Sequence, residues 1–291
     1  MYKGIFPAIV TPFKTDESVD FDAFVTIMKT QEAAGVQGFY FCGTGGEGLM
    51  LTLEERKTLL ALTMKEKAAA TKIIVHISAF FPQDSITLAK HAAEMGADAV
   101  ALLPPGYFQP LDDEAVYQYY AWITKESPLP MFIYHLPEYS HYTMSYALFE
   151  RLINLPNTIG IKDSAGNVMN IFKYVRNSKH PVVLNGQDQT TITALLNGAD
   201  GVISGPANVM PEKFTALWNA FQAGDAAKAG DIQAEINTIL AVLTQYPLVP
   251  AVKQMMNLMG LPAGVPRRPY RLLTDEENVS LRHQIEQIGL L

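Results

Sequence analysis

Eight short apolar runs, separated by longer stretches with a helical pattern, restrict the folds open to this 291-residue chain. The runs are nearly continuous in apolar residues instead of alternating with polar ones, which is typical of parallel strands covered on both faces. Such an alternation of strands and helices predicts an α/β fold. The expected strands are 5–11, 38–42, 72–77, 99–103, 131–136, 158–162, 182–184 and 201–204.

Three glycines favour closure of these strands into a barrel. Gly35, Gly96 and Gly198 each stand where a helical pattern gives way to a strand, and glycine readily adopts the left-handed conformation that ends a helix. Their spacings are close to two and three βα units of about 30–34 residues. A doubly wound sheet normally carries a Gly-x-Gly-x-x-Gly turn after its first strand, and residues 7–15 have none. We therefore predict a (β/α)8 TIM barrel.

Capping residues predict three of the helices. Thr52 and Glu55 have the spacing of a capping box before a helix that reaches about residue 69, Asp84 precedes a helix at 86–95, and Asp112 precedes one at 114–125. The eighth helix of the barrel is expected at 211–223.

No strand pattern follows residue 224. The segments 225–243, 249–259 and 274–288 each have a helical pattern with an apolar face. We predict a catalytic barrel over 1–224 and a C-terminal three-helix extension over 225–291. The apolar faces of the extension are expected to pack on the barrel wall or on another subunit.

The charge balance excludes several partners. Lysine and arginine total 22 against 29 acidic residues, which gives a net charge of −7, and a negative surface repels phosphate backbones and acidic lipids. No apolar stretch reaches the roughly 18 residues of a membrane span, the N-terminus lacks a signal-peptide pattern, and the single Cys42 cannot form an internal disulfide. We expect a cytoplasmic protein that binds neither nucleic acid nor membranes.

Lys162 ends the sixth expected strand, where the active sites of such barrels lie. Burial lowers the pKa of a lysine, and the neutral amine is a nucleophile that condenses with a ketone. The alternative from position alone is a lysine paired with Asp163 at the barrel mouth. Tyr134, in the fifth strand, could relay protons, or it could be a structural residue with a satisfied hydroxyl.

A glycine-rich turn, residues 43–48, follows the second strand and precedes a helix. The backbone N–H groups of such a turn can hold an anion, and its glycines let a ligand approach closely. The turn lacks the Lys-Ser/Thr of a nucleotide P-loop, and the loops at 185–188 and 204–208 supply no basic residue for a phosphate. A carboxylate is therefore the expected ligand, unless the glycines serve only the shape of the turn.

The histidines raise the alternative of a metal site. His135, Glu138 and His141 lie in one loop, but the first strand has no His-x-His pair and the spacing matches no common ligand pattern. His76 is expected to be a satisfied core histidine, and Cys42 a small buried residue. We expect no metal and no cofactor.

Four motifs stand in order at the ends of expected strands. They are the glycine–threonine turn with Glu47, Tyr134-x-x-Pro137, Gly-Ile-Lys162-Asp and Gly-Ala-Asp-Gly-Val-Ile-Ser at 198–204. Together they resemble the pyruvate-dependent class I aldolases, a family that includes dihydrodipicolinate synthase, N-acetylneuraminate lyase and the 2-keto-3-deoxy sugar-acid aldolases. The resemblance covers nearly the whole chain.

The resemblance implies a lyase in which Lys162 forms an imine, or Schiff base, with pyruvate or another 2-keto acid. Tyr134 would shuttle protons, and Thr44 would connect it to Tyr107, which in the family often reaches the site of a neighbouring subunit. Backbone N–H groups of Thr44 and Gly45, in the turn that begins at Gly43, would bind the substrate carboxylate. The protonated imine would accept the electrons released when the bond beyond the α-carbon breaks. A homotetramer of two tight dimers is also implied.

Departures from the family pattern restrict the substrate. Residues 134–139 lack the arginine that dihydrodipicolinate synthase usually has there, and Gly45 replaces its second threonine. Sialate lyase usually has an acidic residue at Gln189 and a serine at Gly205. The polar groups left to line the site suit a polyhydroxylated 2-keto acid, and they belong to Tyr139, Ser140, His141, Gln187, Asp188 and Ser204. We predict cleavage of a 2-keto-3-deoxy sugar acid to pyruvate and an aldehyde.

Three other functions stay open at this point. The same lysine could support a dihydrodipicolinate synthase-like condensation, or the dehydration or deamination of a 2-keto acid. A metal-dependent barrel lyase would use the histidine loop. A non-enzymatic barrel would bind a keto acid without turnover, although a binder needs no lysine nucleophile.

Overall fold

The computed structural model describes residues 2–107 and 110–291, and it contains all eight predicted strands in one sheet. Every pair of neighbouring strands is parallel, as expected for strands joined by crossover helices. The α/β prediction is confirmed. The strands are β1 (Gly4–Pro7), β2 (Gly38–Phe41), β3 (Lys72–His76), β4 (Ala99–Leu102), β5 (Met131–His135), β6 (Thr158–Asp163), β7 (Val182–Asn185) and β8 (Gly201–Ser204).

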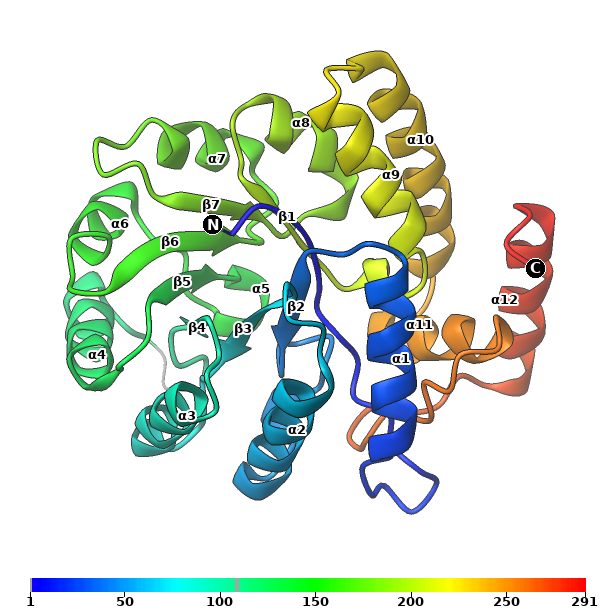
Figure 1. Cartoon of the computed structure of the whole chain (residues 1–291), viewed down its shortest axis with the longest axis horizontal. Coiled ribbons are helices and arrows are strands. Elements are labelled where there is room, and N and C mark those ends of the chain that lie inside the picture. The colour runs from blue at the N-terminus through cyan, green and yellow to red at the C-terminus, as the bar shows by residue number, and fades with distance from the viewer. Residues whose placement is uncertain (1, 108–109) are drawn as a thin grey trace.

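Contacts between the first two strands close the sheet into a barrel (Figure 1). The hydrogen-bonded order runs from β1 through β8 and back down to β2. Ala8 forms a parallel bridge with Tyr40, and the backbone N–H of Gln37 donates to the Ile5 carbonyl at 3.0 Å. The predicted TIM barrel is therefore confirmed over the doubly wound sheet.

Alternate residues of each strand divide the apolar core into two layers. In β1 and β2, Phe6 and Tyr40 point into the barrel, whereas Ile5 and Phe39 pack under the surrounding helices. Both layers are buried, which explains why the strands read as continuous apolar runs. The filled interior leaves the carboxyl ends of the strands as the place for a site.

Helices surround the sheet and follow the strands in sequence. Gly35, Gly96 and Gly198 have φ of 87°, 81° and 99°, so each adopts the predicted left-handed conformation. The helices are α1 (Phe21–Ala33), α2 (Leu53–Glu66), α3 (Pro82–Glu94), α4 (Asp113–Glu126), α5 (Pro137–Ser140), α6 (Tyr146–Leu152), α7 (Val168–Val175), α8 (Thr191–Leu196), α9 (Pro211–Gln222), α10 (Ala226–Leu243), α11 (Leu248–Leu258) and α12 (Asp275–Gln287), with short 3-10 turns η1 (Gly48–Met50), η2 (Asp188–Thr190) and η3 (Pro206–Asn208).

One predicted helix start is wrong. Asp84 does not precede α3 but lies in its first turn, and the helix begins at Pro82. The fixed φ of proline suits the first helical position, which the sequence pattern of apolar residues alone did not reveal. The predicted capping box of Thr52 and Glu55 and the cap at Asp112 are confirmed.

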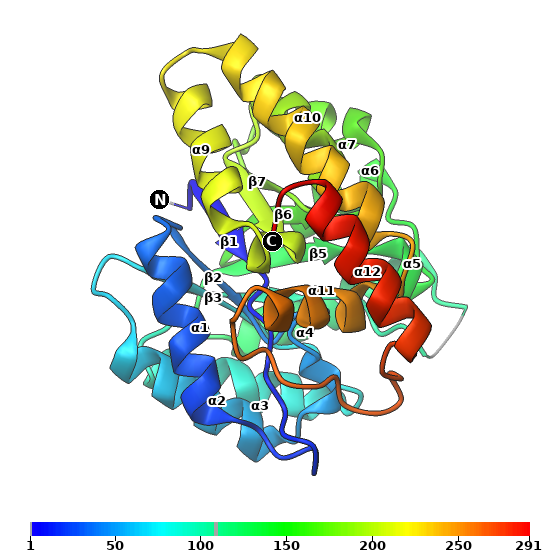
Figure 2. The same cartoon turned by 90° about the vertical axis from the view of Figure 1, so that its right-hand side faces the viewer.

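The C-terminal extension packs on one side of the barrel, where Figure 2 shows α10, α11 and α12 together. Buried residues of all three helices, among them Leu240, Met255 and Ile285, belong to the same apolar cluster as the outer layer of the barrel. The division into a barrel over 1–224 and an extension over 225–291 stays a prediction. In the described part of the chain, no helix combines the length and the apolar character that crossing a membrane requires.

Candidate active site

Lys162 lies at the carboxyl end of β6, where the strand register sets its neighbours. It pairs with Tyr134 of β5 and with Leu184 of β7. The side chain is only 5% exposed, and its Nζ lies 4.1 Å from the centre of the Tyr40 ring and 4.1 Å from the centre of the Tyr134 ring. The amine is therefore held between two aromatic faces and is not paired with Asp163, whose carboxylate contacts His135 instead.

Burial sets the reactivity of this amine. Loss of hydration lowers the pKa of Lys162 to about 7, and the nearby Asp188 carboxylate only partly opposes that shift. A large share of the amine is neutral near pH 7, which is the form that attacks a ketone.

Asp188, at the start of η2, is the charged group that acts on Lys162. Burial raises the pKa of its carboxyl to about 6, while the Ser204 hydroxyl and the lysine oppose the shift. Its Oδ1 is shielded from solvent and has no hydrogen-bond partner among the residues that the structure describes. The carboxyl can therefore accept a hydrogen bond from a bound ligand.

The Tyr134 phenol points toward the glycine-rich turn. Its hydroxyl lies 3.5 Å from the Thr44 hydroxyl, and the side chain is buried. Burial raises the pKa of Tyr134 to about 12, against hydrogen bonds from Thr44 and Ser164, so the phenol keeps its proton at neutral pH. The phenol can donate its proton to a group bound beside Lys162, and it can exchange a proton with the Thr44 hydroxyl.

The glycine-rich turn contributes Thr44 and Gly45 to the wall of the cavity that Lys162 and Tyr134 line. Within residues 2–107 and 110–291, no acceptor is present for the N–H of Thr44 or of Gly45. A Cβ atom at Gly43 would lie 2.5 Å from the Tyr40 ring, so this glycine is required by packing. The turn thus combines a structural need for glycine with the geometry of an anion site.

A cavity of about 430 Å³ joins these groups, which is within the range of small-molecule sites. Lys162, Tyr134, Thr44, Gly45, Gln187, Asp188 and Tyr139 line it, as predicted from the sequence, but Gln187 also donates its amide to the Ser164 carbonyl. Lys162 is the one basic residue in its described lining, whereas Glu138 and Asp188 are acidic. The wall is completed by residues that the sequence did not suggest. Thr244 and Tyr246 lie in the connection between α10 and α11, and Leu248 and Val249 begin α11.

Two predicted lining residues are fully buried and do not line this cavity. The Ser204 hydroxyl accepts a hydrogen bond from the Ala207 N–H at 2.9 Å and also contacts the Asp188 carboxylate. Ser140 is also fully buried, and its hydroxyl donates to the Leu136 carbonyl at the end of α5.

A second cavity, of about 340 Å³, lies on the other side of Thr44. Its wall includes Tyr107, whose side chain is 78% exposed, together with His141 and Tyr139. Thr44 therefore stands between the lysine cavity and the surface that carries Tyr107.

The metal alternative has no support in the histidine loop. His135 donates from Nδ1 to Asp163 at 2.9 Å and accepts at Nε2 from the Met144 N–H, so both ring nitrogens are engaged. The described residues contain no group of three side chains placed to hold a metal ion. His135 instead fixes the loop that follows β5.

The two other candidate groups are buried. Cys42 is 2% exposed, and burial raises the pKa of its thiol to about 11, as expected of an inert core residue. His76 donates from Nδ1 to the Cys42 carbonyl, but its Nε2 has no partner in the described residues. We expected both ring nitrogens to be hydrogen-bonded, and only one of them is.

Comparisons with known proteins match this chain over nearly its whole length. Residues 1–288 match the model of the dihydrodipicolinate synthetase family. An N-acetylneuraminate lyase of Rhizobium meliloti is 30% identical over 98% of this chain and 95% of its own, and a 4-hydroxy-tetrahydrodipicolinate synthase of Methanothrix thermoacetophila is 29% identical over 99% and 98%. A prophage protein of this family from E. coli K12, solved in complex with pyruvate, superposes with a TM-score of 0.94 at 26% identity over the whole of both chains.

Proposed function

The chain belongs to the dihydrodipicolinate synthetase family, and from this premise we propose that it is a class I lyase in which Lys162 forms an imine with a 2-keto acid. The observation that carries the proposal is the position of Lys162. A buried amine with a pKa near 7 shares one cavity with Tyr134 and with the turn at Thr44 and Gly45. A binding protein has no need of this combination.

The cycle begins when the neutral Lys162 amine attacks the keto carbon. Tyr134 supplies a proton to the oxygen that leaves as water, and the protonated imine results. The bond beyond the α-carbon then breaks: its electron pair enters the imine, which becomes an enamine, while the hydroxyl at the leaving carbon gives its proton to Tyr134 and becomes an aldehyde. Protonation of the enamine and addition of water release pyruvate and restore the lysine. The imine itself is the electron sink, so the cycle needs no cofactor.

The glycine-rich turn orients the keto acid in this scheme. The N–H groups of Thr44 and Gly45, which have no acceptor within the described chain, bind the carboxylate, with Gly43 shaping the turn. Thr44 carries protons between Tyr134 and the surface near Tyr107. In a homotetramer of tight dimers, the Tyr107 of a neighbouring chain would complete this relay.

The preferred substrate is a 2-keto-3-deoxy sugar acid, cleaved to pyruvate and an aldehyde. Asp188, Gln187 and Tyr139 offer acceptors and donors for hydroxyl groups, and the acidic lining disfavours an aldehyde with a second carboxylate. The relative named N-acetylneuraminate lyase also supports a keto-sugar acid.

Condensation in the manner of dihydrodipicolinate synthase is the second candidate, favoured by the relative that carries that activity in its name. Dehydration or deamination would use the same imine. Product analysis with a panel of 2-keto acids separates these outcomes. Turnover without pyruvate and without an aldehyde contradicts the cleavage reaction.

Borohydride trapping tests the proposal directly. Reduction in the presence of pyruvate is expected to leave a pyruvyl adduct on Lys162, identified by peptide mass mapping. Lys162→Ala should abolish the adduct, whereas Lys213→Ala, at an exposed lysine that pairs with Glu235 and does not line the cavity, should keep it. An adduct elsewhere, or none in the unaltered chain, contradicts the imine mechanism.

A further inference from the structure

The C-terminal extension contacts the glycine-rich turn through a buried cluster of charges. We call Glu47, Lys253 and Arg267 the Glu47 clamp. Glu47 belongs to the turn, Lys253 to α11, and Arg267 to the segment between α11 and α12. Glu47 belongs to a motif shared with the family, whereas no motif in the sequence includes Lys253 or Arg267.

Lys253 is satisfied entirely inside the protein. Its side chain is 1% exposed, it forms an ion pair with Glu47, and it donates to the carbonyls of Thr11 and Val265 at 2.7 and 2.8 Å. Two of the ammonium protons thus have carbonyl acceptors, and the charge is paired with the Glu47 carboxylate. The amine is committed to holding these segments together and is not available as a second nucleophile.

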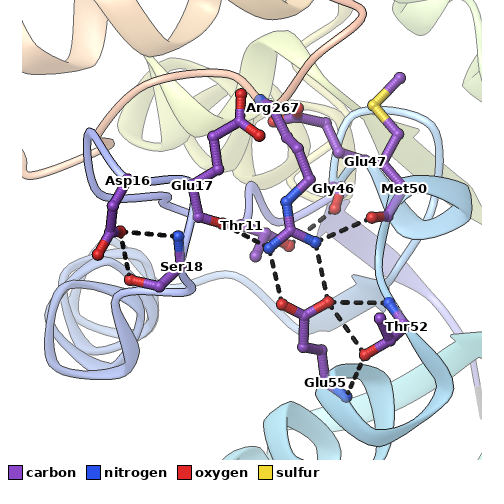
Figure 3. Close-up of polar contacts among 10 residues, drawn as sticks. All are labelled: Thr11, Asp16, Glu17, Ser18, Gly46, Glu47, Met50, Thr52, Glu55 and Arg267. Atoms are coloured by element: carbon purple, nitrogen blue, oxygen red, sulfur yellow. Dashed lines mark hydrogen bonds and ion pairs between the residues drawn. The ribbon is translucent and has the colours of Figure 1, made fainter.

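Arg267 holds the same carboxylate from its other side. Its backbone N–H donates to Glu47 Oε2 at 2.8 Å. Figure 3 shows its guanidinium bound to both carboxylate oxygens of Glu55, at 2.7 and 2.8 Å, and to the carbonyls of Met50 and Glu17. A planar guanidinium with this many acceptors fixes its position far better than a single contact would.

The clamp is connected to the two anion-binding N–H groups through the backbone of the turn. Glu47 has a left-handed conformation with φ of 54°, and its N–H donates to the Thr44 carbonyl at 3.1 Å. Thr11 donates from its hydroxyl to the Gly46 carbonyl at 2.7 Å. A shift of the Glu47 side chain therefore moves the peptide that joins Thr44 to Gly45.

A buried carboxylate and ammonium are a poor way to gain stability, because apolar side chains of similar size often serve as well or better. Charged groups instead fix the geometry, because each of their hydrogen bonds restricts both the direction and the distance of its partner. A carboxylate site built from two backbone N–H groups depends on such geometry, because Lys162 is the one basic side chain in the described lining and is committed to the keto carbon.

We propose that the Glu47 clamp is a positioning device for substrate carboxylate binding, so that the C-terminal extension is a working part of the active site. The inference rests on the proposed function, because it concerns how the turn holds the 2-keto acid. The clamp residues do not touch the substrate; they act through Thr44 and Gly45.

Arg267→Met is the test, measured by borohydride trapping with two ketones. Pyruvate has a carboxylate, whereas acetone has the same reactive ketone without one. The variant is expected to raise the pyruvate concentration for half-maximal trapping by about tenfold or more, because misplaced donors bind the carboxylate weakly. The concentration dependence with acetone should stay unchanged. Arg267→Lys, which keeps the charge but loses the paired contact with Glu55, should shift pyruvate trapping in the same direction by less and serves if Arg267→Met does not fold.

Arg271→Met is the matched control. Arg271 forms an equivalent paired contact with Glu277 on the same extension, at 2.6 and 2.7 Å, but it is exposed and does not reach the turn. Arg271→Met should leave the concentration for half-maximal trapping unchanged with both pyruvate and acetone. If the Arg267 variants lose trapping equally with pyruvate and acetone, or change with neither, the clamp inference is overturned and the proposed lysine chemistry is unaffected. An unaltered chain that traps neither ketone contradicts the lysine chemistry, and the inference with it.

Discussion

The Lys162 amine lies 4.1 Å from the centre of the Tyr134 ring, and neither side chain has more than 5% of its surface exposed. The proposed nucleophile and proton donor are therefore placed by two adjacent strands, β6 and β5. Such rigid placement is what a covalent mechanism requires, because the phenol must reach the atoms that form around the amine.

The rate of imine formation with pyruvate is expected to rise with pH through a midpoint near 7. Desolvation lowers the pKa of Lys162 to about 7, so the amine is mostly protonated and inert below that pH and mostly neutral above it. Single-turnover borohydride trapping at a series of pH values measures the midpoint. A midpoint near the ordinary value for lysine, about 10.4, would mean that the amine is hydrated in solution.

Asp188→Asn is expected to move this midpoint to lower pH. The Asp188 carboxylate stabilises the protonated amine, so an uncharged amide leaves only the desolvation that disfavours it. Glu138→Gln is the matched control, because Glu138 lines the same cavity but does not contribute to the lysine pKa. A shift of equal size in both variants would point to a general field effect instead of the specific pair.

Tyr134→Phe is expected to lower kcat by about 10²–10⁴, the usual contribution of a positioned proton donor. The melting temperature should change little, because the ring stays and only the contacts of the hydroxyl with Thr44 and Ser164 are lost. Tyr40→Phe is the control: its ring lies at the same distance from Lys162, but its hydroxyl has no partner in the described part of the chain. An unaltered kcat in Tyr134→Phe removes the phenol from the mechanism.

The strands and the core of the site could be predicted from the sequence because both depend on local pattern. Buried parallel strands are continuous apolar runs, and the barrel brings their carboxyl ends together, so Lys162, Tyr134 and the turn at Thr44 had to converge. The start of α3 was misplaced because Pro82, and not Asp84, determines it.

Long-range packing explains what the sequence did not reveal. Thr244 and Tyr246 reach the cavity only because α10 and α11 fold back over the barrel, and no local pattern indicates that. The contact of Glu47 with Lys253 joins residues far apart in the chain, and the sequence of α11 does not tell which distant group its lysine meets. Ser204 does not line the cavity itself, although its hydroxyl contacts Asp188, because strand-end position does not tell which way a side chain points.

Lys253→Met is expected to lower the free energy of unfolding by about 3–5 kcal/mol, because it leaves the buried Glu47 carboxylate without its cation. Glu47→Gln in the same chain should recover part of the loss, since an amide is far less costly to bury than a charge. Denaturant titration measures both. Lys213→Met is the control, because the Lys213–Glu235 ion pair is exposed and should contribute less than about 1 kcal/mol. Equal losses at the two lysines would contradict a special role for burial.

Mixing two inactive variants tests whether Tyr107 acts across an interface. Tyr107 is 78% exposed on the surface beyond Thr44, so its hydroxyl is expected to serve the site of a neighbouring chain. In a hybrid dimer of Tyr107→Phe and Lys162→Ala chains, one site combines an intact lysine with an intact tyrosine. Random exchange should therefore restore activity at about a quarter of the sites. Chains with Tyr134→Phe and Lys162→Ala are the control, because both residues belong to one cavity and no hybrid site is complete. If neither mixture recovers activity, Tyr107 acts within its own chain.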